Sequence, residues 1–161
     1  WALIDPDCYS ATHCYSDSPA GYYDNNVDVS LTLATSVNLS TAEAPNLLFW
    51  HKYEIEPNYD FGYVEISTDG GSSWTQLAAY SGFSNDQWIR EQIDLTSYAG
   101  ETSVLIRFRL QTDKTVVMDG WYMDDVTLAE IPHPVTLHVP ANPTSTSLDL
   151  LTLNQNQPIT S

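Results

Sequence analysis

Positive charge is scarce in this sequence. Its 161 residues include five Lys and Arg against 21 Asp and Glu, a formal net charge of −16. Such an acidic chain is repelled by phosphate backbones and anionic membrane surfaces, so we expect no nucleic-acid partner. No apolar run reaches the roughly 18 residues that a membrane span needs, and we expect no membrane insertion. The sequence opens at Trp1, which suggests an excerpt of a longer precursor.

Recognisable catalytic motifs are also lacking. The four histidines are scattered, and there is no His-Glu-x-x-His, no Gly-x-Ser-x-Gly and no glycine-rich phosphate loop. Glu54 and Glu56 resemble a glycosidase pair only superficially, because Pro57-Asn58 ends the strand there and chance pairs are expected among 21 acids. We therefore predict that this chain is not itself an enzyme.

Cysteine is limited to Cys8 and Cys14, six positions apart. In a secreted protein they would close a small ring, and we predict a disulfide. Free thiols are the alternative. A zinc half-site that includes His13 lacks the second ligand pair that zinc requires. Only 16% of the residues are charged, and Ser, Thr, Asn and Tyr are frequent, as is typical of extracellular proteins.

Helical periodicity is absent, whereas alternation of apolar and polar residues recurs. Within 47–55, Leu47, Phe49, His51, Tyr53 and Ile55 share one face. The expected strands are 29–39, 47–55, 62–68, 74–80, 88–95, 103–111 and 121–128. Short strands separated by Gly, Pro, Asn and Asp favour an all-β, antiparallel sandwich.

The domain organisation changes near residues 129–134. Four prolines follow between positions 132 and 143, and fresh alternation begins at Ser145. We expect a β-sandwich module over 1–130. A linker and the incomplete start of a second β module are expected over 131–161.

Several sequence blocks point to a known family. The blocks are Leu-Leu-Phe-Trp-His-Lys-Tyr at 47–53, Gly-Tyr-Val-Glu-Ile-Ser-Thr-Asp-Gly-Gly-Ser-Ser-Trp at 62–74, Ile-Arg-Phe-Arg-Leu at 106–110 and Asp-Gly-Trp-Tyr-Met-Asp-Asp-Val-Thr-Leu at 119–128, with a further stretch at 15–26. Together they resemble the MAM-like jelly-roll modules of secreted bacterial hydrolases. The nearest form follows the catalytic part of immune-inhibitor-A-type metallopeptidases and some subtilisin-like proteases.

The resemblance implies a jelly-roll β-sandwich that acts as a non-catalytic accessory module of a larger secreted or surface hydrolase, with a peptidase as the expected parent. The main partner is then a catalytic domain in the same polypeptide, and the location is extracellular. The tail resembles the entry to a fibronectin-type-III-like domain. The acidic residue of the family's first strand is missing here, or is replaced by Asp5 or Asp7.

Acidic residues in turns suggest a calcium site. Asp17, Asp24 and Asp28 lie in turn-forming sequence, and alternation places Asp124 and Asp125 on opposite faces of the last strand. Calcium takes about six to eight oxygen ligands in flexible geometry. The resemblance likewise implies a structural calcium between an early loop and the last strand, with Asp17, Asp24, Asp28 and Asp125 as ligands. Solvated turns, with Asp125 bonded to backbone amides, are the alternative.

Residues 67–74 match the Asp-box pattern Ser-x-Asp-x-Gly-x-Ser-Trp. A single copy cannot form the propeller in which such boxes recur. We interpret it as a structural turn in which the carboxylate accepts backbone amides.

Arginine and aromatic residues coincide on outward strand positions. The candidate ligand-binding residues are Trp50, Tyr63, Glu65, Arg107, Arg109 and Trp121. They would form a saccharide or peptide cleft, or else the arginines and Glu65 are ordinary cross-strand ion pairs. The module would then contact a glycan or a protein surface. The alternative functions are a carbohydrate-binding module and a structural interaction domain of a surface protein.

Overall fold

A computed structural model describes residues 1–131 apart from 6 and 11. Apart from Ile131, the linker and second β segment expected over 131–161 lie outside the described residues. The described elements are β1 (Ala2–Ile4), β2 (Cys14–Ser16), β3 (Asp28–Thr32), β4 (Pro45–Ile55), β5 (Phe61–Ser67), β6 (Thr75–Tyr80), β7 (Gly82–Phe83), β8 (Ile89–Asp94), the short 3-10 helix η1 (Thr96–Tyr98), β9 (Leu105–Gln111) and β10 (Gly120–Glu130).

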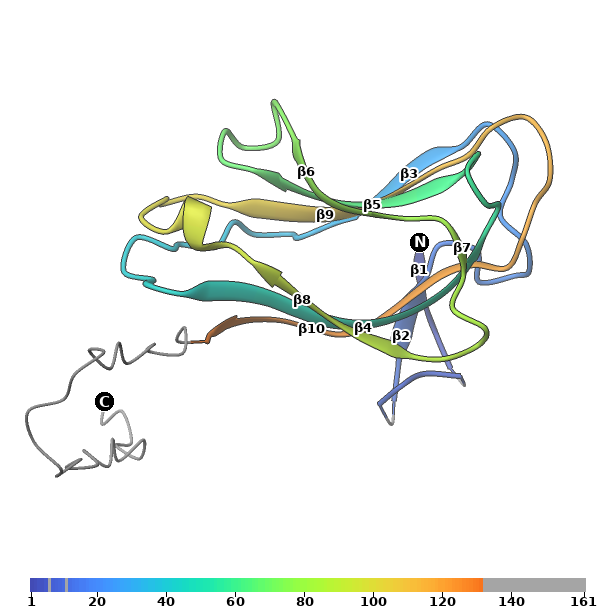
Figure 1. Cartoon of the computed structure of the whole chain (residues 1–161), viewed down its shortest axis with the longest axis horizontal. Helices are drawn as coiled ribbons and strands as arrows, with labels where there is room; N and C mark the ends of the chain where they lie inside the picture. Colours follow the sequence, from blue (N-terminus) through green and yellow to red (C-terminus); the bar gives the residue numbers. More distant parts are fainter. Residues whose placement is uncertain (6, 11, 132–161) are drawn as a thin grey trace, which may run out of the picture.

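The strands form two antiparallel sheets that lie face to face (Figure 1). Sheet A has the order β1-β2-β10-β4-β7, with β8 also paired to β4, and sheet B has the order β3-β9-β5-β6. The predicted all-β sandwich is confirmed. Among the described residues, no helix is long and apolar enough to cross a membrane.

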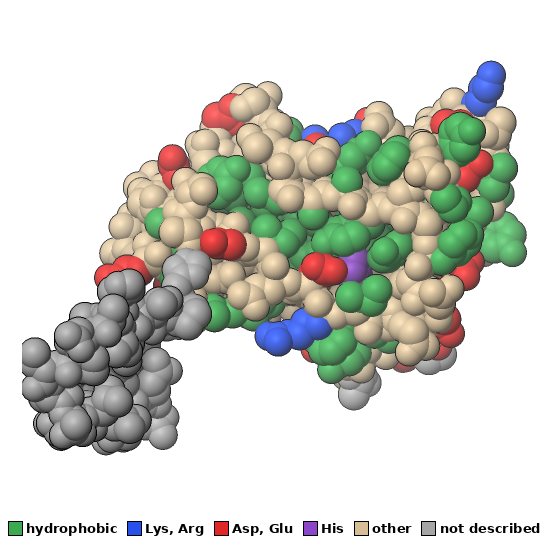
Figure 2. Space-filling model, viewed as in Figure 1, with side chains coloured by type: hydrophobic (Ala, Val, Ile, Leu, Met, Phe, Trp, Pro, Cys, Tyr) green, Lys and Arg blue, Asp and Glu red, His purple; other side chains and the backbone are tan. Residues whose placement is uncertain are grey.

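Alternating side chains of both sheets fill the core. Leu47, Phe49, His51 and Ile55 of β4 are buried, as the predicted common face requires. Ile106, Phe108 and Leu110 of β9 meet them from sheet B. Hydrophobic side chains gather where the two layers meet on the face shown in Figure 2. Burial of these side chains is the main stabilising contribution to such a sandwich.

Trp121 lies in the centre of this core. Its side chain has no exposed surface, and its ring contacts Trp1, Tyr80 and Phe108 at centroid distances of 6.0, 5.7 and 5.9 Å. A Cβ on Gly62 would lie 2.6 Å from this ring. Glycine at position 62 is therefore what allows β5 to pass this close to the indole.

One expected strand is too long. The strand predicted over 29–39 ends at Thr32, and Val37 forms only an isolated bridge with Val104. Alternation continues beyond Thr32 because residues such as Val37 still pack against the core, although the ladder with β9 has ended. The short strands β1, β2 and β7 were not predicted, because two or three residues carry no measurable period.

A β-bulge interrupts β10. Asp124 lies opposite Trp50 and Thr127 opposite Leu48, so β10 contains one extra residue between these pairs. Asp125 occupies the bulge with φ +47° and is exposed, whereas Asp124 is 5% exposed. The buried carboxylate of the pair is therefore Asp124 and not Asp125, the one predicted as a calcium ligand.

Candidate functional site

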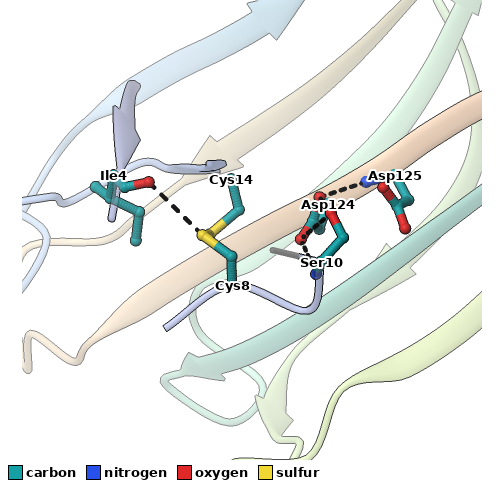
Figure 3. Close-up of a disulfide and its surroundings, with 6 residues drawn as sticks. All are labelled: Ile4, Cys8, Ser10, Cys14, Asp124 and Asp125. Atoms are coloured by element: carbon teal, nitrogen blue, oxygen red, sulfur yellow. Dashed lines mark hydrogen bonds between the residues drawn. A yellow bond between two sulfur atoms is a disulfide. The ribbon is translucent and has the colours of Figure 1, made fainter. Parts of the chain in front are cut away.

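The disulfide loop covers part of the outer face of sheet A. Cys8 and Cys14 form a disulfide, and Ser10 turns towards Asp124 (Figure 3). The Ser10 amide donates to Asp124 Oδ2 at 2.8 Å, and the Asp125 amide donates to Asp124 Oδ1 at 2.7 Å. These hydrogen bonds offset the free-energy cost of burying the Asp124 carboxylate. The backbone-amide alternative proposed for Asp125 thus applies to its neighbour Asp124.

The predicted ligand-binding residues do not share one surface. Strands β5 and β9 of sheet B hold Tyr63, Glu65, Arg107 and Arg109. Trp50 lies on β4 of sheet A, and its ring stacks on that of Tyr9 with 3.8 Å between the ring centroids. Trp121 is buried between the sheets and cannot contact a ligand. The prediction of one cleft formed by all six residues is therefore wrong. Strand pairing places them in different sheets, which the alternation pattern of single strands could not indicate.

On the outer face of sheet B, Glu65 binds both arginines. Glu65 Oε2 accepts from Arg107 Nε at 2.6 Å and from Arg109 Nε at 3.0 Å, and Arg109 Nη2 reaches Oε1 at 3.2 Å. Burial opposes ionisation of Glu65, but the hydrogen bonds from Arg109 and Arg107 outweigh it and lower the pKa of the carboxyl.

The same arginines also face aromatic rings. Arg107 lies 4.2 Å from the centroid of Trp74, and Arg109 lies 4.8 Å from that of Tyr63. Arg109 further pairs with Asp28 at 3.3 Å. Both guanidinium groups already have charged and aromatic partners, so this arrangement favours cross-strand ion pairs over a ligand cleft.

An open pocket of about 410 Å³ lies against sheet A and is lined by residues of β4, β10 and the adjoining loops. Lys52 Nζ binds Asp86 Oδ1 at 3.0 Å and lies 4.9 Å from the centroid of Tyr122, whose hydroxyl donates to Asp119 Oδ2 at 2.9 Å. The pocket is lined by Tyr22, Lys52, Tyr53, Glu54, Ser84, Asp86, Asp119 and Tyr122. Rings beside carboxylates and an ammonium group can stack on a sugar and bond to its hydroxyls.

Alternation within 47–55 leaves Lys52 and Glu54 on the face opposite to Leu47 and Phe49, but no sequence pattern groups the other pocket residues with them. Tyr22, Asp86 and Asp119 come from three separate loops, which only the fold brings together. The one available signal is Tyr22, an aromatic residue in a turn-forming stretch, whose side chain is 70% exposed.

The four predicted calcium ligands are dispersed. Asp17 and Asp24 line one open groove of about 400 Å³, whereas Asp28 pairs with Arg109 and Asp125 is exposed at the β10 bulge. None of the four belongs to a group of three potential metal ligands within 4.8 Å. The structure therefore does not support one calcium ion held by all four.

Asp17 has a different role. Its Oδ1 accepts the Trp121 amide at 2.5 Å and so fixes the start of β10. Burial raises the pKa of its carboxyl to about 6, although the bond from Trp121 acts in the opposite direction.

Two other groups of potential metal ligands do meet in the described part of the chain. In the first, Cys8 and Cys14 accompany Asp124, but sulfurs joined in a disulfide offer no thiolate. The second consists of Glu56, Asp60 and Asp113. Burial and the nearby carboxylates of Asp113 and Asp60 raise the pKa of Glu56. No sequence pattern indicates this group, because Asp113 lies 53 residues from Asp60 in the chain.

The Asp-box forms the turn between β5 and β6, as predicted. Asp69 Oδ1 accepts the Ser73 amide at 2.9 Å, Asp69 Oδ2 accepts the Ser73 hydroxyl at 2.6 Å, and Ser67 also donates to Oδ1. These bonds, led by the Ser73 hydroxyl, lower the pKa of Asp69 to about 2. The carboxylate is used within its own turn.

Comparison with known proteins gives two curated proteases as relatives. The chain is 30% identical over 121 residues to bacillopeptidase F of Bacillus subtilis (strain 168), covering 75% of this chain and 8% of that protein. It is 30% identical over 117 residues to the pre-pro-metalloprotease PrtV of Vibrio cholerae serotype O1, covering 66% of this chain and 12% of that protein. The chain thus spans about a tenth of the length of each relative.

Among solved structures, the K2 cleaved adhesin domain of Lys-gingipain has a TM-score of 0.50 and 18% identity, covering 75% of this chain and 73% of that one. A family 61 carbohydrate-binding module in complex with β-1,4-galactotriose has a TM-score of 0.48 and 16% identity, covering 78% and 75%. At these identities, the adhesin domain supports the fold alone. A model of the immune inhibitor A-like MAM domain matches residues 16–132, and the chain belongs to that family.

Proposed function

We propose that this chain is a non-catalytic accessory module of a larger secreted protease, joined to the catalytic domain in one polypeptide. The observation that carries the proposal is membership of the immune inhibitor A-like MAM family together with two protease relatives, of which the module is only 8% and 12%. The disulfide and the small charged fraction support an extracellular location.

The arrangement of the histidines that the structure describes supports a non-catalytic role. His51 is fully buried, its Nδ1 accepts Trp121 Nε1–H at 3.1 Å, and burial lowers its pKa to about 4. It therefore packs in the core and has no access to a substrate. His13 is exposed in the disulfide loop, far along the chain from the sheet A pocket residues Lys52 and Tyr122.

The sheet A pocket is the proposed attachment surface, and a glycan is its proposed ligand. Tyr22 and Tyr122 offer aromatic faces, while Glu54, Asp86 and Asp119 offer hydroxyl acceptors. The outer face of sheet B is the weaker candidate because both of its arginines already form ion pairs with Glu65, and Arg109 also pairs with Asp28. The module is further proposed to hold a structural calcium ion, which suits its excess of carboxylates.

The attachment proposal is tested with insoluble polysaccharides and a glycan array. The full chain should be retained on at least one glycan, and a Tyr22→Ala/Tyr122→Ala variant should lose about tenfold or more in retention, because stacking surface is removed. Tyr59→Ala is the matched control, since Tyr59 is 65% exposed and does not line the pocket. Equal loss in the control, or no retention of the unmodified chain, contradicts glycan attachment and favours a structural interaction domain.

The accessory role is tested in a parent protease that carries this module. Deleting the module should leave cleavage of a short soluble peptide unchanged and reduce cleavage of an insoluble or cell-bound substrate. Loss of peptide cleavage in the deleted enzyme, after its catalytic domain is shown to be folded, contradicts the proposed role.

A further inference from the structure

We propose that Glu56, Asp60 and Asp113 bind one calcium ion at the end of the sandwich where the β4–β5 and β9–β10 loops meet. The right-hand end of Figure 1 shows these loops beside the segment that leads into β3. The inference rests on the proposal that the module holds a structural calcium ion and assigns that ion to residues different from those that the sequence suggested.

Three carboxylates lie together at this end of the sandwich. One oxygen from each of Glu56, Asp60 and Asp113 lies within 4.8 Å of the others. Asp60 has no exposed surface. None of the ion pairs among the described residues includes any of the three. Like charges at this spacing repel one another, and a proton or a cation between them relieves the repulsion.

Glu56 supplies a second observation. Its Oε2 is buried and has no hydrogen-bond partner. A buried carboxylate oxygen without a donor is destabilising, and buried polar atoms in folded proteins are rarely left in this state. A cation among the three carboxylates would give this oxygen the partner that no donor of the described residues provides.

The other two carboxylates are held in place by donors. Asp60 Oδ1 accepts the Asp113 amide at 2.6 Å, and Asp60 Oδ2 accepts the Tyr23 hydroxyl at 2.8 Å. The Tyr23 hydroxyl in turn accepts the Glu56 amide at 3.0 Å. These bonds bring the loop after β4 and the loop after β9 to one point, so the oxygens are positioned before an ion binds.

The chemistry of the donors selects the ion. All three side chains offer hard oxygen atoms, and neither histidine nor thiolate belongs to the group, which disfavours zinc. Calcium accepts variable numbers of oxygens from loops, whereas magnesium demands near-octahedral geometry and keeps much of its water. Calcium therefore suits a loop junction better than magnesium does.

The proposed site is tested by measuring calcium binding and thermal unfolding of the full chain. For the unmodified chain, calorimetric titration should give one calcium ion per chain, and Tm should rise by about 5 °C in excess CaCl2 relative to EDTA. Glu56→Gln should weaken calcium affinity at least tenfold and remove most of the Tm shift. Glu54→Gln is the matched control, because it removes the same charge two residues away, and its calcium affinity and Tm shift should equal those of the unmodified chain.

A second variant covers the case in which Glu56→Gln fails to fold. Asp113→Asn keeps an oxygen that accepts from Thr115 and keeps the amide that donates to Asp60, and it should also lose calcium binding. If calcium raises Tm equally in Glu56→Gln and Glu54→Gln, and Asp17→Asn removes the effect, the module holds calcium but this site is wrong. If CaCl2 and EDTA give the same Tm for the unmodified chain, both the site and the structural calcium are wrong.

Discussion

The Asp-box turn and the loop junction at the opposite end of the sandwich satisfy their carboxylates in different ways (Figure 1). Asp69 takes its donors from Ser67 and Ser73, all within one turn, and its pKa is lowered to about 2. Asp60 takes a donor from Asp113, 53 residues away, and the nearby Glu56 retains a buried oxygen without a partner. A local motif completes its own hydrogen bonding, whereas a junction of distant loops can leave an acceptor for a cation.

The largest expected effect comes from breaking the junction at its centre. Asp60→Ala should lower the free energy of unfolding by about 3–4 kcal/mol, because the Tyr23 hydroxyl and the Asp113 amide lose their buried acceptor. Urea denaturation in EDTA measures this effect without any bound ion. Asp24→Ala, at an exposed position, should change it by less than about 0.5 kcal/mol. Equal effects of the two changes would contradict a structural role of Asp60.

A carboxylate that pairs across strands should have the next largest effect. Glu65→Gln should lower the free energy of unfolding by about 2–3 kcal/mol, since Arg107 and Arg109 would lose their shared counter-charge on a face where Glu65 is only 7% exposed. Chemical denaturation measures the change. A change near zero would show that the exposed parts of the two guanidinium groups recover their hydration fully.

Asp17 should give stability a pH dependence of the opposite sign to that of Asp69. Its folded pKa of about 6 lies above the ordinary value of 3.8, so its contribution is fully present below pH 4 and is lost as pH rises through 6. Across this window the free energy of unfolding should fall by about 1–2 kcal/mol relative to Asp17→Asn. Denaturation at several pH values in EDTA measures the difference, and parallel profiles of the two proteins would contradict it.

Asp69 should give the smallest effect on stability, and the pH dependence of that effect should be confined to acid pH. Because its folded pKa of about 2 lies below the ordinary value of 3.8, its contribution is present above pH 4 and is lost as pH falls through 2. Asp69→Asn should therefore lower Tm at pH 7, where this contribution is present, and should flatten the Tm profile between pH 4 and 2. Thermal unfolding followed by tryptophan fluorescence measures the profile. If Asp69→Asn lowered Tm at pH 7 more than Asp60→Ala does, the Asp-box turn would matter more for stability than the loop junction, which would contradict the comparison.

Strand alternation made much of the fold predictable, and it also misled the prediction of the binding face. His51 was correctly placed with Leu47 and Phe49, because a half-buried strand repeats every two residues. Trp121 was placed beside Tyr63 on a surface, but it lies in the core. Alternation tells which residues of one strand share a face, but it does not relate that face to those of strands in another sheet.

The acidic residues show the same limit. The sequence predicted calcium from Asp17 and Asp125, yet Asp125 lies exposed in the bulge of β10. The buried carboxylate is Asp124, which accepts the Ser10 amide of the disulfide loop. A single inserted residue reverses the faces of its neighbours, and no local pattern indicated it. Asp60 and Asp113 carry no motif at all, because their proximity follows from the pairing of β5 with β9.

By itself, the sequence determined the all-β class, most strand positions, the Asp-box turn and the family, because alternation, turn residues and short motifs act over a few neighbouring positions. The tertiary structure alone decided which carboxylates meet, which aromatic residues are buried and which loops line the sheet A pocket. The physical reason is that these contacts depend on sheet pairing and closure between residues far apart in the chain.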